Sequence, residues 1–262
     1  MPFFTPGDDP GANFAELLRR VGLGNHTIAP ASGTPLNVPH ATTCVAFRYA
    51  DGVIMAGDRR ATSGNWISHR DMEKVMPADR LSAVAIAGAA GPAMEMVKLF
   101  QLQLEHYEKV EGTVLTLDGK ANQLSAMIRS NLPAAMQGMA VVPIFAGYDS
   151  HEGTGRLFAY DVTGGRYEER DQVATGSGSM QAATVVKVGY HDGMPREDAI
   201  ELCVKALWEA AEADAATGGP DPVRGIFPVV ATITAAGYER VGDEELRERF
   251  DAVIAAERAR RT

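Results

Sequence analysis

The chain has 262 residues, of which 45% are hydrophobic and 23% are charged, a composition typical of a globular domain. Its net charge of −9 and pI of about 5.2 argue against a nucleic-acid-binding protein, which usually presents a basic face. We expect no membrane partner either, because no apolar run of about 18 residues is present and the N-terminus lacks the apolar segment of a secretory signal.

Residues 1–41 differ in composition from the rest. The stretches TPGDDPGA and APASGTPLNVPH are rich in proline, glycine, serine and threonine, which is typical of loops or disorder. Between them, residues 13–22 have helical spacing, with apolar residues at Phe14, Leu17, Leu18 and Val21. One short helix cannot build a core, so this leader is interpreted as a docking segment, a pro-peptide or a disordered arm.

From Thr42 onward the pattern is dense and regular. Strands are predicted at 42–49 and 53–57, around a hairpin turn at Ala50-Asp51-Gly52, and at 81–88. Two helices follow, at 92–112 and 119–136, and Pro133 should end or kink the second.

The second half repeats this layout without repeating the sequence. The predicted elements are strands at 140–149 and 155–164, a turn at 175–179, helices at 180–190 and 195–216, a strand at 225–237 and an exposed amphipathic helix at 242–261. Long runs of like elements favour an α+β domain over alternating βαβ units. The two helix pairs could then cover the outer faces of stacked sheets, with no domain boundary after residue 42.

Cysteine and histidine patterns predict neither a metal nor a cofactor. Cys44 and Cys203 cannot form a disulfide framework, and the six histidines form no HExxH pair. Reduced cysteines are typical of a cytoplasmic protein.

Thr42 acquires a distinctive chemistry if the chain is cut after Ala41. The residue would carry a hydroxyl and a free α-amine, whose pKa of about 7.7–8.0 leaves it partly neutral and able to act as a general base. The hairpin turn should bring Asp58 back beside Thr42. Lys74 is a candidate cation that would lower the proton affinity of both groups, and Asp58 would hold it.

Gly88 precedes a predicted helix at a place where backbone can approach a ligand, so its N–H is a candidate oxyanion donor. Each of these residues also has a plainer interpretation. Thr42 could be an ordinary strand residue, Asp58 part of a solvated ion-pair cluster with Arg59 and Arg60, Lys74 a surface lysine and Gly88 a turn residue.

Several segments together resemble the β-subunits of actinobacterial 20S proteasomes. They include TTCVAFRYADGVIMAGDRRAT, KVMPADRLSAVAIAGAAGPAMEM, LEHYEKVEG, GSGSM and DAATGGPDPVRGIFP, and the resemblance runs from Thr42 to about Pro228. It implies a four-layer αββα sandwich of the N-terminal-nucleophile hydrolase type. It also implies a threonine endopeptidase that removes residues 1–41 by self-cleavage and leaves a catalytic domain at 42–262.

The resemblance also assigns roles to individual residues. The catalytic set it implies consists of Thr42 as nucleophile and base, its partners Asp58 and Lys74, the oxyanion donor Gly88, and the supporting residues Ser177, Asp214 and Thr217. The substrate pocket it implies is formed by Ala61, Met72, Ile86 and Ala90, with Thr62 pairing with the substrate backbone. Because these side chains are small or uncharged, a chymotrypsin-like preference for apolar residues is expected.

The partners implied by the resemblance are proteasome α-subunits, other β-subunits in stacked heptameric rings, a ring-shaped ATPase and protein substrates tagged by a ubiquitin-like modifier. One residue departs from the family pattern, which has glycine before the catalytic threonine where this chain has Ala41. Because alanine is less tolerant of a strained turn, we expect slower processing. The leader helix is expected to dock on a neighbouring subunit.

Two alternatives remain open. A simpler two-ring bacterial threonine protease also begins with two threonines, but the segments at 105–112 and 216–228 fit that group poorly. A non-catalytic or unprocessed structural ring subunit would be expected to lack part of the Thr42, Asp58 and Lys74 set, which is complete here.

Overall fold

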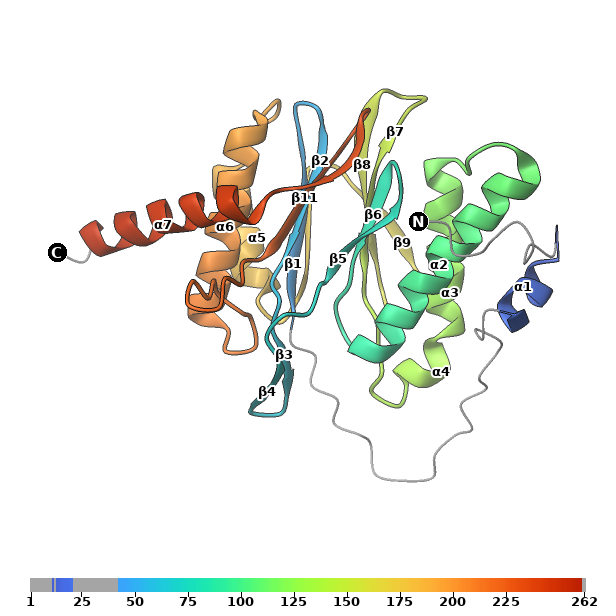
Figure 1. The fold of residues 1–262 in the computed structure, drawn as a ribbon, viewed down its shortest axis with the longest axis horizontal. Coiled ribbons are helices and arrows are strands. Elements are labelled where there is room, and N and C mark those ends of the chain that lie inside the picture. Colours follow the sequence, from blue (N-terminus) through green and yellow to red (C-terminus); the bar gives the residue numbers. More distant parts are fainter. Residues whose placement is uncertain (1–10, 12, 21–41, 261–262) are drawn as a thin grey trace.

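The computed structural model describes residues 11, 13–20 and 42–260. Two antiparallel five-stranded sheets pack face to face, and helices cover the outer side of each sheet (Figure 1). The predicted α+β class and the four-layer αββα sandwich are thus confirmed.

The first sheet has the order β10-β1-β2-β11-β12. Its strands are β1 (Thr43–Tyr49), β2 (Gly52–Gly57), β10 (Gln172–Gly176), β11 (Val229–Thr234) and β12 (Gly237–Arg240). The second sheet has the order β5-β6-β7-β8-β9. Its strands are β5 (Val75–Asp79), β6 (Ser82–Ala85), β7 (Ile144–Asp149), β8 (Thr154–Tyr160) and β9 (Arg166–Glu169). A separate hairpin of β3 (Ala61–Ser63) and β4 (Trp66–His69) extends from the lower end of the sandwich in Figure 1.

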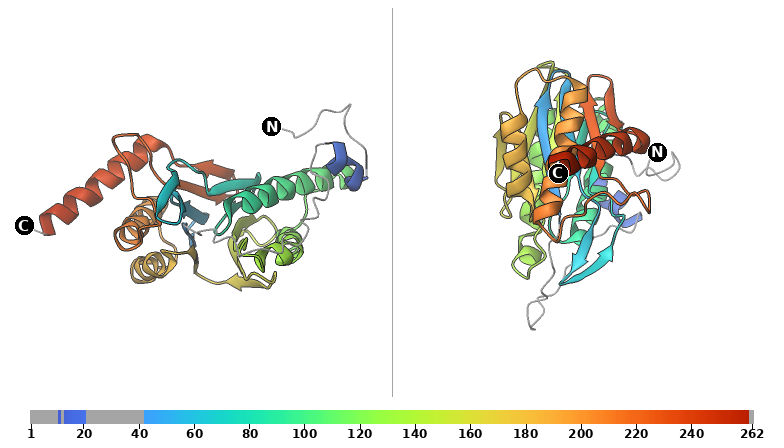
Figure 2. Two further views of the ribbon diagram at one scale, coloured as in Figure 1. Left: turned by 90° about the horizontal axis from the view of Figure 1, so that it is seen from below. Right: turned by 90° about the vertical axis from the view of Figure 1, so that its left-hand side faces the viewer.

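Helices flank both sheets. The first sheet is covered by α5 (Ser179–Gly189), α6 (Arg196–Ala213) and the first turns of α7 (Asp243–Arg260). The second sheet is covered by α2 (Ala90–Glu111) and α3 (Leu117–Ser130), and the short α4 (Leu132–Ala135) follows α3. The later turns of α7 project away from the sandwich, as Figure 1 and the left view of Figure 2 show.

Strand β1 shows why the central strands read as continuous apolar runs. Val45 and Phe47 belong to the core beneath α5 and α6, whereas Cys44 and Ala46 belong to the core between the sheets. A strand buried on both faces has no polar side, so alternation disappears from its sequence. The small residues on the inner face let the two sheets approach closely.

The break expected near Pro133 is confirmed, since the helix predicted at 119–136 divides at Asn131 into α3 and α4, and Pro133 lies in the first turn of α4, where its missing N–H is tolerated. Some predicted boundaries were wrong. The tail helix is not exposed throughout, since Leu246 and Phe250 are buried in the core. The strands predicted from residues 140 and 225 begin at Ile144 and Val229.

The leader contributes one helix to the described structure, α1 (Phe14–Arg20), within the predicted range of 13–22. Leu17 is fully buried against Leu102 of α2, and His106 Nε2 lies 2.7 Å from the Gly11 carbonyl oxygen. The helix therefore docks on its own chain, whereas docking on a neighbouring subunit stays a prediction. Most of the predicted pro-peptide, including Ala41, lies outside the described residues. Within the described part of the chain, no helix is long and apolar enough to span a membrane.

Candidate active site

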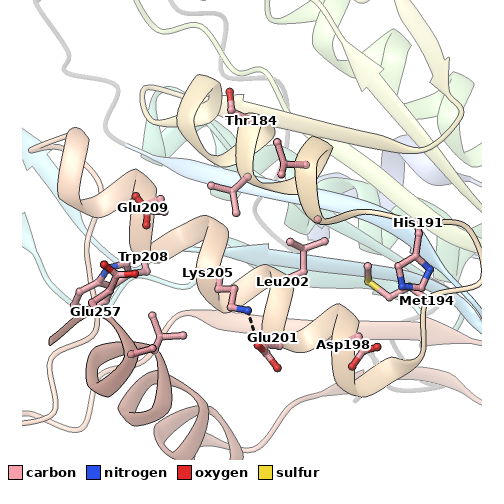
Figure 3. Close-up of a pocket in the computed structure, with 15 residues that line it drawn as sticks. Thr184, His191, Met194, Asp198, Glu201, Leu202, Lys205, Trp208, Glu209 and Glu257 are labelled. Atoms are coloured by element: carbon pink, nitrogen blue, oxygen red, sulfur yellow. Dashed lines mark ion pairs between the residues drawn. The ribbon is translucent and has the colours of Figure 1, made fainter. Parts of the chain in front are cut away.

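One groove on the helix side of the first sheet contains none of the predicted site residues. It has a volume of about 570 Å³ and lies between α5, α6 and α7 (Figure 3). Its polar groups are those of a surface: Lys205 and Glu201 form an ion pair at 2.5 Å with both side chains half exposed, and the Thr184 hydroxyl donates to the Met180 carbonyl of its own helix. A groove without a nucleophile beside a base is a poor candidate for catalysis.

A smaller cavity of about 170 Å³ lies where the predicted residues converge. Thr42, Lys74 and Gly88 line it. All five residues of the predicted substrate pocket line it as well, namely Ala61, Thr62, Met72, Ile86 and Ala90. Sequence reasoning missed the remaining lining residues, which are Ser63, Ser68, His69, Ala87 and Ala93.

Strand ends bring these residues together. Thr42 directly precedes β1, and the register that pairs Cys44 with Gly57 carries Asp58 alongside Thr43, whose carbonyl accepts the Asp58 N–H at 3.1 Å. In the facing sheet, Lys74 directly precedes β5 and Gly88 follows β6. The site is therefore built at one edge of the interface between the two sheets.

Asp58 and Lys74 form a buried ion pair. Lys74 Nζ lies 2.7 Å from Asp58 Oδ1, and the two side chains are 1% and 0% exposed. Nζ also donates to the Arg60 carbonyl at 2.5 Å, and Asp58 Oδ2 accepts the N–H groups of Arg60 and Gly218 at 2.9 and 2.8 Å. The plainer interpretations, a surface lysine and a solvated aspartate, are wrong. Desolvating two charges is costly, so a pair this well satisfied points to a specialised role.

Asp214 organises a second polar cluster. The hydroxyls of Ser177 and Thr217 both donate to Asp214 Oδ2, at 2.5 and 2.6 Å. Burial raises the pKa of Asp214, but the hydrogen bonds from Ser177, Thr217 and the Ala216 N–H outweigh burial, so the pKa lies below its ordinary value. The cluster touches the nucleophile candidate through Ser177, whose N–H donates to the Thr42 carbonyl at 2.8 Å.

Gly88 occupies a backbone geometry that only glycine adopts readily. Its φ is +108°, and a Cβ there would collide with the Ala140 carbonyl. The bridge between Gly88 and Val141 uses the Ala87 carbonyl and the Ala89 N–H as its hydrogen-bonding groups, so the Gly88 N–H points away from the partner strand. This N–H belongs to a residue that lines the cavity.

Thr43 is a site residue that sequence reasoning missed. Its side chain points to the helix side of the sheet, as those of Val45 and Phe47 do, but the residue takes part in both polar clusters. Its N–H donates to Asp58 Oδ1 at 2.8 Å, and its Oγ1 lies 2.6 Å from Thr217 Oγ1. A hydroxyl in a strand buried on both faces needs a hydrogen-bond partner, and that requirement was the available signal.

In the described part of the chain, no group of three or more histidine, cysteine, aspartate or glutamate side chains is placed to hold a metal. The described site contains the hydroxyl of Thr42, the carboxylates of Asp58 and Asp214 and the ammonium group of Lys74, which are groups of the kind used in acyl transfer.

Comparison with known proteins agrees with this geometry. A family model described as "Proteasome subunit" matches residues 38–223. The chain is 53% identical over 264 residues to "Proteasome subunit beta" of Acidimicrobium ferrooxidans, covering 100% of this chain and 97% of the relative. It is 54% identical over 247 residues to "Proteasome subunit beta" of Streptomyces griseus, covering 94% of this chain and 88% of the relative. The chain belongs to the proteasome subunit family, and the relatives it resembles are β-subunits.

Proposed function

We propose that the protein is a catalytic β-subunit of a 20S proteasome, a threonine endopeptidase that hydrolyses peptide bonds of unfolded proteins. The observation that carries this proposal is the buried Asp58–Lys74 pair on the cavity that Thr42 lines. A structural ring subunit, the alternative, has no need for two desolvated charges beside a threonine.

In the proposed mechanism, Thr42 Oγ1 attacks the substrate carbonyl carbon while its proton passes to the neutral α-amine of the same residue, directly or through water. The Gly88 N–H donates to the oxyanion that develops on the carbonyl oxygen. The protonated amine then gives its proton to the leaving nitrogen, and the C–N bond breaks to leave an ester on Thr42. Water activated by the amine hydrolyses this ester and restores the hydroxyl.

The two polar clusters act on different groups of Thr42. The positive charge of Lys74 lowers the proton affinity of the hydroxyl and the amine, and Asp58 fixes the position of that charge. Ser177 and Asp214 fix the other side of Thr42 through the Thr42 carbonyl and the hydrogen bond between them.

The free amine requires removal of residues 1–41, and we propose that the chain cleaves itself at the Ala41–Thr42 bond to leave residues 42–262. The Thr42 hydroxyl would attack the Ala41 carbonyl, shift the acyl group to an ester, and release the leader on hydrolysis. Because the strained turn disfavours alanine relative to glycine, this step is expected to be slow.

The apolar lining of the cavity supports a preference for apolar side chains on the amino side of the cleaved bond. Ala61, Met72, Ile86 and Ala90 provide no counter-charge, so a charged side chain would lose its hydration without compensation. Thr62, on the edge strand β3, is placed to pair with the substrate backbone.

We further propose assembly with α-subunits and with other β-subunits in heptameric rings, served by a ring-shaped ATPase that delivers substrates tagged by a ubiquitin-like modifier. Exposed apolar side chains support contacts between subunits, since Met180 and Val188 of α5 are 77% and 83% exposed and Val188 lines the groove between α5, α6 and α7. A cytoplasmic location is consistent with the two cysteines, which are both free and buried.

The proposal is tested with the full-length chain produced together with its α-subunit. A fluorogenic peptide ending in leucine or tyrosine should be hydrolysed by the assembled protein and not by the Thr42→Ala variant. Equal hydrolysis by both proteins would remove Thr42 from the mechanism and leave the structural-subunit alternative.

A further inference from the structure

We propose that Thr43 is a positioning residue. Its hydroxyl bonds to the Asp214 cluster and its backbone N–H bonds to the Asp58–Lys74 pair, and together these contacts fix Thr42 in its reactive orientation. The proposal rests on the function proposed above. It assigns to the second threonine of the pair a role that does not involve contact with substrate.

The direction of the hydrogen bonds follows from counting protons. The Thr217 hydroxyl donates its single proton to the Asp214 carboxylate, so it can only accept from Thr43. Thr43 Oγ1 in turn accepts the Gly178 N–H at 3.1 Å. The chain therefore runs from Gly178 N–H through the hydroxyls of Thr43 and Thr217 to the carboxylate. Because every link points towards the negative charge, each bond polarises and strengthens the next.

The peptide group between Thr42 and Thr43 is held on both sides. Its N–H, from Thr43, donates to Asp58 Oδ1 at 2.8 Å, the oxygen that also accepts Lys74 Nζ at 2.7 Å. Its C=O, from Thr42, accepts the Ser177 N–H at 2.8 Å. The orientation of this peptide plane determines where the Cα of Thr42 directs its amine and its hydroxyl.

The surroundings of Thr43 are closely packed. The side chain is fully buried, and a Cβ on Gly178 would collide with Thr43 Oγ1 and come close to Thr217 Oγ1. The glycine at 178 thus permits the close approach that the hydrogen bond requires. Loss of the Thr43 hydroxyl would leave the buried Gly178 N–H without its acceptor, since water cannot reach it.

The test compares four substitutions in the assembled protein. Thr43→Val removes the hydroxyl and nearly keeps the shape, Thr43→Ser keeps the hydroxyl, and Thr43→Cys keeps a weaker donor of similar size. Thr232→Val is the matched control, because Thr232 is a buried threonine of the same sheet, in β11 opposite Ile54 and away from the site. The kcat and KM for an apolar peptide are measured for each, together with the melting temperature.

We expect Thr43→Val to lower kcat by up to about a hundredfold with little change in KM, as for a small misplacement of reacting groups. Thr43→Ser should recover most of kcat, and Thr43→Cys should fall between them. Thr232→Val should keep the wild-type kcat even where its melting temperature falls. If Thr43→Val does not fold, comparing the kcat of Thr43→Cys with that of Thr43→Ser still tests whether the hydroxyl at this position supports catalysis.

Two outcomes would overturn the proposal: a wild-type kcat in Thr43→Val or Thr43→Cys, or a kcat in folded Thr43→Ser as low as in Thr43→Val. Thr42→Ala is assayed alongside to separate this result from the proposed function. If Thr42→Ala is active, the proposed function fails; if it is inactive and Thr43→Val is fully active, only the role of Thr43 fails.

Discussion

Lys74 Nζ and Asp58 Oδ1 lie 2.7 Å apart, and the two side chains are 1% and 0% exposed to solvent. Breaking such a pair leaves one uncompensated charge in the interior. Lys74→Met should therefore lower the free energy of unfolding by about 3–5 kcal/mol and abolish peptide hydrolysis.

Urea unfolding of the full-length chain measures this loss, and Lys205→Met serves as the control. The Lys205–Glu201 pair has side chains 49% and 48% exposed, so its loss should cost about 0–1 kcal/mol. Equal losses in the two variants would mean that burial of the Asp58–Lys74 pair does not increase its contribution to the free energy of unfolding.

Ser177→Ala should move the acid-induced loss of folding stability to higher pH. The pKa of Asp214 is depressed, so the stabilisation that depends on its carboxylate is present above the ordinary value of about 3.9 and is lost as pH falls through the depressed pKa. Removing the Ser177 hydrogen bond raises that pKa towards its ordinary value, so the loss begins at a higher pH.

The profile of the free energy of unfolding against pH is recorded between about pH 3 and 6, a range that includes the ordinary pKa of an aspartate. Ser130→Ala, which removes an exposed hydroxyl that bonds only to the helix carbonyl of Ala126, should leave the profile unchanged. A loss of stability that begins at the same pH in Ser177→Ala as in the wild-type chain would contradict the role of Ser177 in depressing the pKa of Asp214.

Met72→Glu should reduce hydrolysis of peptides that have an apolar residue directly before the cleaved bond. It should favour peptides that have lysine or arginine there instead. The carboxylate would enter an otherwise uncharged lining and offer a basic side chain the partner that it now lacks. The ratio of kcat/KM for the two peptide classes measures the change. Met136→Glu, at a methionine that is 82% exposed and outside the cavity, is the matched control. An unchanged ratio in Met72→Glu would place the specificity pocket elsewhere.

Cys44 lies beside the site, yet it should resist alkylation in the folded protein. Burial raises the pKa of its thiol to about 12, although the Lys74 charge opposes this effect, and burial also raises the pKa of Cys203. Because the thiolate is the reactive form, neither residue should react with iodoacetamide at about pH 8, while both should react after unfolding. Rapid labelling of Cys44 in the native state would contradict the buried position.

The strands that sequence predicted and those it missed differ in their place in the sheets. All the central strands, β1, β2 and β11 in one sheet and β6, β7 and β8 in the other, were predicted, because burial on both faces gives continuous apolar runs. The four edge strands β5, β9, β10 and β12 were missed. Edge strands are half solvated and tolerate breaks such as Pro77 in β5, so their pattern is weak.

The site shows a similar division. The position of Asp58 followed from local sequence, because a hairpin turn fixes which residues return beside Thr42. Lys74 and Gly88 come from the facing sheet. The packing of one sheet on another produces no periodic pattern in the sequence, so the placement of these two residues depended on the family resemblance. Thr43 was missed because alternation predicts the face of a side chain but not its hydrogen-bond partners.

The state of the N-terminus tests the central claim, that Thr42 becomes an N-terminal nucleophile. Intact-mass spectrometry of the assembled protein measures this state directly, for the wild-type chain and for Thr42→Ala. We predict that the wild-type chain begins at Thr42 and that Thr42→Ala keeps residues 1–41. A wild-type protein that hydrolyses peptides with its leader intact, or a Thr42→Ala variant that loses the leader at the same bond, would contradict the account.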